Sequence, residues 1–228
     1  MADIPIPFLP AGAVFDMDGL LLDTERPVLV LWIELSRKLG WDVSEETVLR
    51  TVGVNETDTR AAFINVHGPE FPYDRIRDEL IRTFAERAGK EGIPCRPGLP
   101  TLLERLEGLG VPMGIATSSD REAALWKLDR AGLGGRFSVL VCGDEVSRGK
   151  PAPDIFLLAA EKLGKPPAEC VGFEDSPAGL WALHNAGIPS VFIKDIIEPP
   201  GDILKTVWRR CADLAEAAAL FGPPCPKA

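Results

Sequence analysis

Short apolar runs alternate with helical patterns along most of this chain, and this alternation limits its fold more than any other feature. The runs occupy residues 11–16, 111–117, 138–142, 170–174 and 190–194. Strands that alternate with helices of about 10–15 residues indicate βαβ units and a parallel sheet. Strands this apolar are expected to be covered on both faces. The chain is therefore predicted to be an α/β protein with a doubly wound parallel sheet.

Residues 24–94 break this rhythm, because their apolar residues recur at helical spacing without a convincing strand pattern. Helices are expected over residues 28–39, 45–52, 58–66 and 76–88. A stretch rich in Gly and Pro at residues 92–100 is typical of a boundary. We predict a helical domain over residues 24–94, inserted into an α/β core formed by residues 1–23 and 95–228. Near the C-terminus, an apolar helical pattern over residues 203–211 is expected to lie against that core.

Charge and the rarer residues exclude several classes of function. The net charge of −9 argues against nucleic-acid binding, which depends on Lys and Arg. Two histidines, His67 and His184, are too few for a His-rich metal site. Neither a zinc pattern nor a disulfide framework fits the five cysteines, Cys95, Cys142, Cys170, Cys211 and Cys225. No run has the length of a membrane span or the pattern of a signal peptide, so we expect a cytoplasmic protein without a membrane partner.

Carboxylates stand where two of the predicted strands end. Asp16 and Asp18 follow the first strand, and Glu174 and Asp175 occupy the same place after a later one. Ligands of open α/β sheets bind beyond the carboxyl ends of the strands. Two carboxylates 4 Å apart repel by about 4 kcal/mol at an effective dielectric constant near 20, and a hard cation such as Mg²⁺ removes that repulsion. The alternatives are a solvated acidic turn and helix capping by Asp175 or Ser176.

Two further strand ends carry groups suited to a phosphate. Thr117, Ser118 and Ser119 offer hydroxyl and backbone N–H groups, and Lys150 offers a positive charge. Ser119 and Glu122 also have the spacing of a capping box, so Ser119 is expected to cap the next helix. A single lysine or serine says little, but four such strand ends in chain order form a far more specific pattern.

The four motifs resemble those of the haloacid-dehalogenase-like superfamily of phosphohydrolases, in the branch with a helical cap after the first motif. The matching stretches are FDMDGLLLDTE (15–25), ATSS (116–119), GKPAPDIF (149–156) and GFEDSPAG (172–179). The resemblance covers essentially the whole chain and implies a Rossmann-like core with an inserted α-helical cap domain. The chain is most similar to the group that holds β-phosphoglucomutase, pseudouridine 5′-phosphatase, 2-deoxyglucose-6-phosphatase and phosphoglycolate phosphatase.

The same resemblance implies a role for each motif residue. Asp16 is expected to be a nucleophile that becomes an aspartyl-phosphate, and Asp18 a general acid and base. Thr117 and Ser118 are expected to bind phosphoryl oxygens, while Lys150 neutralises charge between the nucleophile and the phosphate. Four residues are expected to hold Mg²⁺: Asp16, Asp18 through its backbone carbonyl, Glu174 and Asp175.

The helical cap is expected to close over the site and to select the leaving group. Glu25, Asn55 and Glu56 are the candidate specificity residues of the cap. Two simpler interpretations stay open, because Asn55 also suits the cap of the next helix and Glu25 also suits a surface pair with Arg26.

The leading prediction is a Mg²⁺-dependent phosphatase for a small-molecule phosphate ester, such as a sugar phosphate or a nucleoside monophosphate. We expect it to act as a monomer or weak homodimer. One alternative is a phosphosugar mutase, although β-phosphoglucomutase-like sequences carry His where this chain has Val28 and Arg where it has Glu56. A second alternative is a non-catalytic phosphate-binding module, against which the intact motif residues argue.

Overall fold

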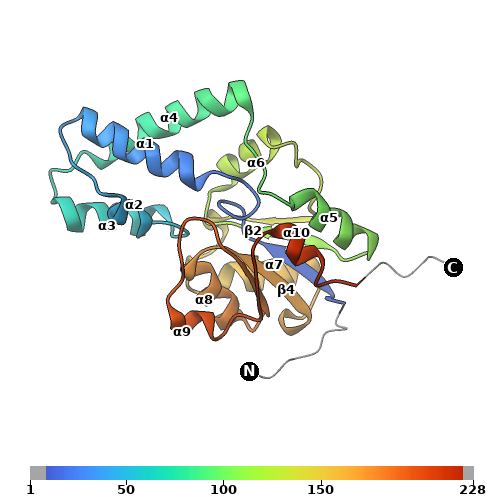
Figure 1. Cartoon of the computed structure of the whole chain (residues 1–228). Helices are drawn as coiled ribbons and strands as arrows, with labels where there is room; N and C mark the ends of the chain where they lie inside the picture. Colours follow the sequence, from blue (N-terminus) through green and yellow to red (C-terminus); the bar gives the residue numbers. More distant parts are fainter. Residues whose placement is uncertain (1–8, 223–228) are drawn as a thin grey trace.

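The structure is a computed structural model that describes residues 9–222. Its centre is a six-stranded sheet, in the order β3-β2-β1-β4-β5-β6, in which every neighbouring pair of strands is parallel (Figure 1). The strands are β1 (Gly12–Phe15), β2 (Met113–Ala116), β3 (Val139–Val141), β4 (Cys170–Glu174), β5 (Ser190–Ile193) and β6 (Arg209–Cys211). The predicted α/β fold with a parallel sheet is confirmed.

Helices cover both faces of this sheet. They are α5 (Leu99–Gly108), α6 (Arg121–Arg130), α7 (Asp154–Leu163), α8 (Pro177–Ala186), α9 (Gly201–Leu204) and α10 (Leu214–Ala218). The central strand β1 explains the two layers, because successive side chains of a strand point to opposite faces. Ala13 and Phe15 lie in the apolar cluster with α5, α6 and α10. Val14 lies in a second cluster, with α7 and α8.

The helical insertion is also confirmed, and four helices form it: α1 (Glu25–Lys38), α2 (Glu45–Leu49), α3 (Glu56–His67) and α4 (Tyr73–Glu91). Figure 1 shows them grouped together beside the sheet. They share an apolar cluster of their own, centred on the stacked rings of Trp32, Phe63 and Tyr73. The division of the chain at residues 23/24 and 94/95 remains a prediction.

One buried carboxylate ties together the two chain crossings between the helical insertion and the sheet. Asp195 follows β5, and its side chain is fully buried. Its Oδ1 lies 3.0 Å from Nη1 of Arg26, at the first crossing, and 2.8 Å from Nη1 of Arg96, at the second. Arg96 also donates a hydrogen bond to the carbonyl oxygen of Lys194, at 3.2 Å. Both crossings are therefore fixed to the same point of the core.

Replacement of this carboxylate, Asp195→Ala, is expected to lower the free energy of unfolding by about 2–4 kcal/mol, because it leaves the mostly buried Arg96 without its counter-ion. For a chain of this length that corresponds to a fall in Tm of roughly 4–16 °C. Urea and thermal unfolding measure the effect. The control is Asp129→Ala, whose side chain is 70 % exposed, and it should change stability by less than about 0.5 kcal/mol. Equal stability of the two variants would contradict the role given to Asp195.

The prediction of a single helical pattern over residues 203–211 is wrong. Helix α9 ends at Leu204, and the chain then adds the edge strand β6, which pairs with β5. Backbone hydrogen bonding to an existing sheet edge outweighs the local spacing of apolar residues. Ile203 and Cys211 are nonetheless buried against the core, as expected.

The described residues also bear on the expectations about cysteines and membranes. Four of the five cysteines lie within residues 9–222, and all four are free thiols. No described helix has both the length and the apolar character needed to cross a membrane. Cys225 and the first eight residues, on which the disulfide and signal-peptide expectations partly rest, lie outside the described part of the chain.

Candidate active site

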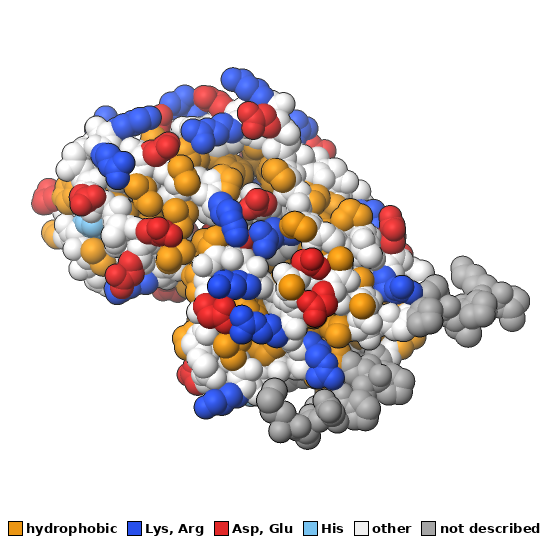
Figure 2. Space-filling model, in the orientation of Figure 1, with side chains coloured by type: hydrophobic (Ala, Val, Ile, Leu, Met, Phe, Trp, Pro, Cys, Tyr) orange, Lys and Arg blue, Asp and Glu red, His pale blue; other side chains and the backbone are white. Residues whose placement is uncertain are grey.

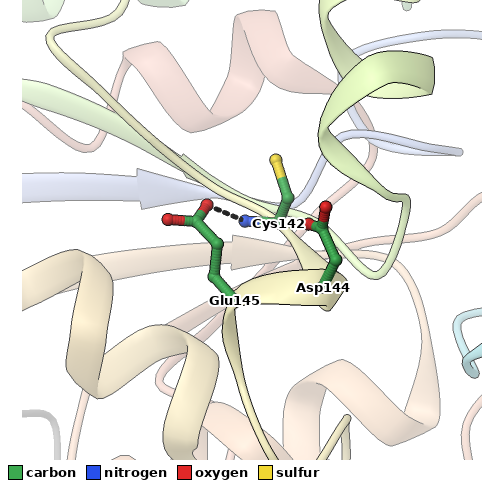
Figure 3. Close-up of side chains that lie close together, drawn as sticks. All are labelled: Cys142, Asp144 and Glu145. Carbon is green, nitrogen blue, oxygen red and sulfur yellow. Dashed lines mark hydrogen bonds between the residues drawn. The ribbon is translucent and has the colours of Figure 1, made fainter.

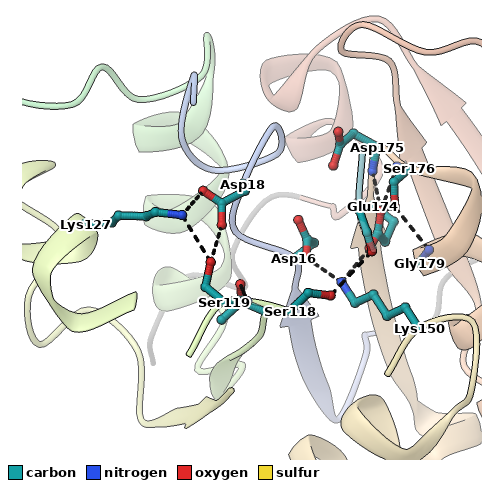
Figure 4. A network of polar contacts seen from close by, with 12 residues as sticks. Asp16, Asp18, Ser118, Ser119, Lys127, Lys150, Glu174, Asp175, Ser176 and Gly179 are labelled. Atoms are coloured by element: carbon teal, nitrogen blue, oxygen red, sulfur yellow. Dashed lines mark hydrogen bonds and ion pairs between the residues drawn. The ribbon is translucent and has the colours of Figure 1, made fainter. Parts of the chain in front are cut away.

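Three carboxylates meet at the carboxyl ends of β1 and β4. These strands are parallel neighbours in register, so the residues that follow them lie side by side. Asp16 follows β1, Glu174 ends β4, and Asp175 comes next (Figure 4). All three are buried, and a carboxylate oxygen from each lies within 4.8 Å of one from each of the others. Chain topology alone thus brings together groups that are about 160 residues apart in sequence.

A buried lysine joins two of these carboxylates. Lys150 is 1 % exposed, and its ammonium contacts Oδ1 of Asp16 and lies 2.7 Å from Oε1 of Glu174. Burial alone would lower the pKa of Lys150, but the two carboxylates outweigh it and hold that pKa above its ordinary value. Lys150 is therefore a fixed positive charge in the floor of the site.

Two of these carboxyl groups, Asp16 and Asp175, have raised pKa values. Burial raises the pKa of Asp16 to about 7, although Lys150 acts in the opposite direction. Burial, together with the nearby Glu174 and Asp16, holds the pKa of Asp175 well above its usual range. Three acidic groups against one ammonium leave a deficit of positive charge at this edge of the sheet.

Both oxygens of Glu174 are already engaged by the protein. Oε1 accepts from Lys150, and Oε2 accepts from the backbone N–H groups of Asp175 and Ser176, each at 2.8 Å. The Ser176 hydroxyl adds a third contact to Oε2, at 3.0 Å. A side-chain carbon on Gly179 would overlap this carboxylate, so the first turn of α8 needs a glycine there. Glu174 thus holds Lys150 and the start of α8 in place.

The acidic groups fit a hard divalent cation. Oδ1 of Asp175 is buried and has no hydrogen-bond partner among the described residues, although buried polar atoms are normally paired. The available donors are carboxylate oxygens, the ligand type that Mg²⁺ prefers. Asp16 and Asp175 are the residues whose oxygens remain available for such an ion, while Glu174 stands behind them.

A second acidic group, at the end of β3, is a much poorer metal site. It consists of Cys142, Asp144 and Glu145 (Figure 3). Glu145 accepts from the backbone N–H of Cys142 and from the side chains of Arg121 and Lys162. Burial raises the pKa of the Cys142 thiol to about 11, which disfavours the thiolate form that binds metals.

The fourth acidic residue, Asp18, faces a different set of partners (Figure 4). Its carboxylate lies 2.7 Å from Nζ of Lys127 and accepts from the hydroxyls of Thr24, at 2.8 Å, and Ser119, at 2.9 Å. Burial acts to raise the pKa of Asp18, but Lys127 and these hydrogen bonds outweigh it and lower the pKa below its ordinary value. Asp18 is therefore held as a carboxylate.

Ser119 is not the helix cap that its spacing predicts. Asp120 caps α6 instead, accepting from the backbone N–H of Ala123 at 2.8 Å. This shift of one residue frees the Ser119 hydroxyl to reach Asp18. The capping-box prediction is wrong because a neighbouring carboxylate serves the same helix end and a tertiary partner takes the serine.

The predicted phosphate-binding residues follow β2, which lies on the other side of β1. Thr117 is 1 % exposed, and its hydroxyl oxygen accepts from the backbone N–H of Ser119, at 3.1 Å. Ser118 directs its hydroxyl toward the carbonyl oxygen of Gly53, at 3.4 Å. Thr117 and Ser118 line the same cavity as Asp16 and Asp18.

That cavity has a volume of about 700 Å³ and lies between the strand ends and the helical insertion. Gly53 sits against Ser176 and Ser118, so the loop before α3 touches two of the core motifs. Glu25 and Glu56 also line the cavity, and their role in specificity stays a prediction. Ligand sites commonly measure roughly 300–1,000 Å³, so this volume suits a small metabolite.

A family model described as haloacid dehalogenase-like hydrolase matches residues 10–187. The chain belongs to the haloacid dehalogenase-like hydrolases.

The names of two relatives of this hydrolase describe phosphatases of small phosphate esters. Phosphorylated carbohydrates phosphatase of Thermotoga maritima is 33 % identical over 185 residues, which cover 79 % of this chain and 83 % of that protein. Probable pseudouridine-5′-phosphatase of Drosophila melanogaster is 38 % identical over 192 residues, 80 % of each chain. A solved structure of CbbY from Rhodobacter sphaeroides with xylulose-(1,5)bisphosphate has a TM-score of 0.76 at 25 % identity, covering 93 % of this chain and 100 % of that one. The prediction of a phosphoric monoester hydrolase of this family is confirmed.

The candidate specificity residues of this hydrolase divide into two kinds. Asn55 caps α3, accepting from the backbone N–H of Asp58 at 3.0 Å, so its simpler interpretation holds. Glu25 does not pair with Arg26, which binds Asp195 instead. Burial, and then the nearby Asp18, raises the pKa of Glu25 to about 8.

Sequence reasoning missed Lys127, which contacts both Asp18 and Ser119. The signal was present in the helical period. Lys127 follows Asp120, the N-cap residue of α6, by seven residues, which is about two helical turns. A lysine at that place lies on the same side of the helix as the strand end that precedes it.

Proposed function

We propose that this hydrolase is a Mg²⁺-dependent phosphatase that hydrolyses a small phosphorylated metabolite through an aspartyl-phosphate on Asp16. One observation carries the proposal: a buried lysine joins two buried carboxylates, next to Asp175 with its unpaired oxygen, and one of the joined carboxylates, Asp16, lines a metabolite-sized cavity. Stability alone does not explain such a group, because apolar side chains of similar volume often stabilise a core as well as a buried ion pair does.

The chain's own residues provide two chemical steps. In the first, an oxygen of Asp16 attacks phosphorus and forms a new P–O bond as the bond to the leaving oxygen breaks. In the second, water attacks the aspartyl-phosphate and releases inorganic phosphate. Asp18, held as a carboxylate by Lys127, is in the form that accepts the proton of this water, and it returns that proton to the next leaving oxygen.

Positive charge supplies the remaining part of the catalysis. Lys150 provides a fixed charge beside Asp16, and Thr117 and Ser118 provide hydrogen-bond donors for phosphoryl oxygens. Asp16, Asp175 and the backbone carbonyl of Asp18 would hold Mg²⁺, which would neutralise charge on the phosphate. Glu174 would not bind the ion directly but would hold Lys150 in position. Phosphoryl transfer depends mainly on such positioning and charge.

The substrate class proposed is a phosphorylated carbohydrate or nucleoside monophosphate. The names of the relatives and the cavity volume support it. The position of Val28 in the cavity wall supports hydrolysis over a mutase, since an apolar side chain neither gives nor takes a proton there. We further propose that residues 24–94 act as a cap, and that the protein works in the cytoplasm as a monomer or weak homodimer. On the face shown in Figure 2, basic and acidic side chains are interspersed, which offers no broad basic surface to a nucleic acid.

The direct test is the release of inorganic phosphate from a panel of sugar phosphates, nucleoside monophosphates and 2-phosphoglycolate. Turnover is expected with Mg²⁺ and is expected to fall to background in excess EDTA. Absence of turnover across the panel, or equal turnover with EDTA, would overturn the proposal.

Mg²⁺ is also expected to stabilise the fold. At a concentration 100 times its Kd, the ion adds about 2.7 kcal/mol to the free energy of unfolding, or roughly 5–11 °C in Tm. Differential scanning fluorimetry with MgCl₂ against EDTA measures this shift. Asp175→Asn is expected to remove most of it, whereas Asp144→Asn, in the other acidic group, should leave it intact. A shift that survives Asp175→Asn would place the ion elsewhere.

A further inference from the structure

The half of the cavity beyond the phosphate site is mostly apolar. The apolar side chains of its wall come mainly from helices α1, α2, α4 and α6, and include Val28, Trp32, Leu80, Ile81, Phe84 and Trp126. Ile81 remains 49 % exposed although it is large and apolar. An apolar wall in a cavity of this size favours a ligand that itself has apolar surface to bury.

Two aromatic rings meet in an edge-type contact across the boundary between the helical insertion and the core. Phe84 belongs to α4 and Trp126 to α6, and their ring centroids are 6.3 Å apart at an interplanar angle of 62°. Both rings line the cavity and are only partly buried. Trp126 is also the residue next to Lys127, which holds Asp18. A flat group attached to the leaving oxygen therefore has an aromatic surface within the cavity on which to stack.

The charges of the cavity wall give a second indication of the substrate, namely its own charge. Among the described residues that line it, six are acidic and only Arg77 and Lys127 are basic. Both basic side chains are already paired: Lys127 lies 2.7 Å from Asp18, and Arg77 lies 2.8 Å from Glu56. Lys150 is buried beneath Asp16 and does not line the cavity. A second anionic group on the substrate would thus meet acidic side chains, while both basic side chains among the described lining residues are already engaged.

We propose that the preferred substrate is a phosphate monoester of an uncharged alcohol that carries a flat ring, as a nucleoside 5′-monophosphate does. This inference rests on the proposed phosphatase function and narrows its substrate class. It disfavours bisphosphates and esters with a carboxylate in the leaving group, because like charges in a partly buried site repel. It also disfavours bare polyols, which leave the aromatic surface uncovered.

Two matched pairs of esters test the two parts of the proposal with the wild-type protein and Mg²⁺. Uridine 5′-monophosphate and ribose 5-phosphate differ by the base, and 2-hydroxyethyl phosphate and 2-phosphoglycolate differ by the carboxylate. We expect kcat/KM to be at least about tenfold higher for the first member of each pair. A ratio of one or less in either pair overturns this inference while the phosphatase function stands. No turnover of any of the four overturns both.

Variants then test which residues cause each substrate preference. Trp126→Leu keeps an apolar side chain but removes the aromatic face, and it should lower the uridine-to-ribose ratio by about tenfold. The neighbouring Leu125 is 53 % exposed and does not line the cavity, so Leu125→Ala is the matched control and should keep the ratio. An unchanged ratio in Trp126→Leu would contradict stacking on this ring.

Glu56→Gln tests the charge argument by a gain of activity. It removes one acidic group and releases Arg77 from its contact with the carboxylate of Glu56, although Arg77 retains Asp78, at 3.1 Å. We expect kcat/KM for 2-phosphoglycolate to rise about threefold to tenfold relative to 2-hydroxyethyl phosphate. An unchanged or lower ratio would contradict the proposed repulsion of anionic leaving groups.

Discussion

Asp16→Asn is expected to lower kcat for phosphate release by at least about 10⁴-fold, because an amide cannot serve as the nucleophile that accepts the phosphoryl group. Asparagine has the same shape, and its oxygen can still accept from Lys150, so the fold should persist. The substitution also removes one of three crowded carboxylates, of which Asp16 has its pKa raised to about 7 by burial. Tm in EDTA is therefore expected to stay the same or to rise.

Three measurements separate a chemical loss from a structural one. Phosphate release gives kcat, thermal unfolding in EDTA gives stability, and intact mass after an acid quench reports covalent phosphate. The wild type should carry a phosphoryl group during turnover, whereas Asp16→Asn should carry none. Asp129→Asn, on the exposed face of α6, is the control and should behave as the wild type. Retention of more than about one per cent of activity in Asp16→Asn would show that another group is the nucleophile.

Most of the sheet was predictable because β1, β2, β4 and β5 are buried on both faces and so appear as unbroken apolar runs. The run at residues 170–174 matches β4 in full, and Pro177 and Gly187 mark the ends of α8 as their backbone preferences require. The helical insertion was equally visible, since its helices bury one face against each other and keep a helical period. Local sequence determines structure most clearly where burial and periodicity agree.

Two elements, β6 and α5, were not predicted from the sequence, for different reasons. Strand β6 contains Arg209, Arg210 and Cys211, and it forms because the edge of β5 offers backbone hydrogen bonds. Helix α5 has apolar residues at Leu99, Leu102, Leu103 and Leu106, a clear helical period that directly follows the Gly- and Pro-rich boundary stretch. Strand β6 could be predicted only from its pairing with the sheet, whereas the pattern of α5 is present in the sequence itself.

The site shows the same limit at the level of side chains. Motif spacing placed Asp16, Asp18 and Glu174 at strand ends, but it did not fix where each carboxylate points. The Asp18 carboxylate contacts Lys127, which is 109 residues away in sequence. The Glu174 oxygens accept hydrogen bonds from Lys150 and from the backbone at the start of α8. These orientations are set by competition among several buried partners, which no local pattern records.

Lys150→Met is expected to lower kcat by about 10³-fold, because it removes the fixed positive charge beside the attacking oxygen. The same change leaves the buried Asp16 and Glu174 without the ammonium that lies between them. In EDTA the free energy of unfolding is therefore expected to fall by about 3–5 kcal/mol. Lys162→Met removes a half-exposed pair with Glu145 instead, and it should cost less than about 1 kcal/mol and leave kcat unchanged.

A double variant distinguishes the catalytic role of the Lys150 charge from its structural role. In Lys150→Met with Glu174→Gln, one unpaired buried carboxylate becomes neutral, so part of the lost stability should return. The charge beside Asp16 is still missing, so kcat should stay about 10³-fold low. Urea unfolding in EDTA and phosphate release in Mg²⁺ measure the two quantities separately. Recovery of kcat together with stability would show that Lys150 only holds the fold, whereas recovery of stability alone assigns it to the reaction.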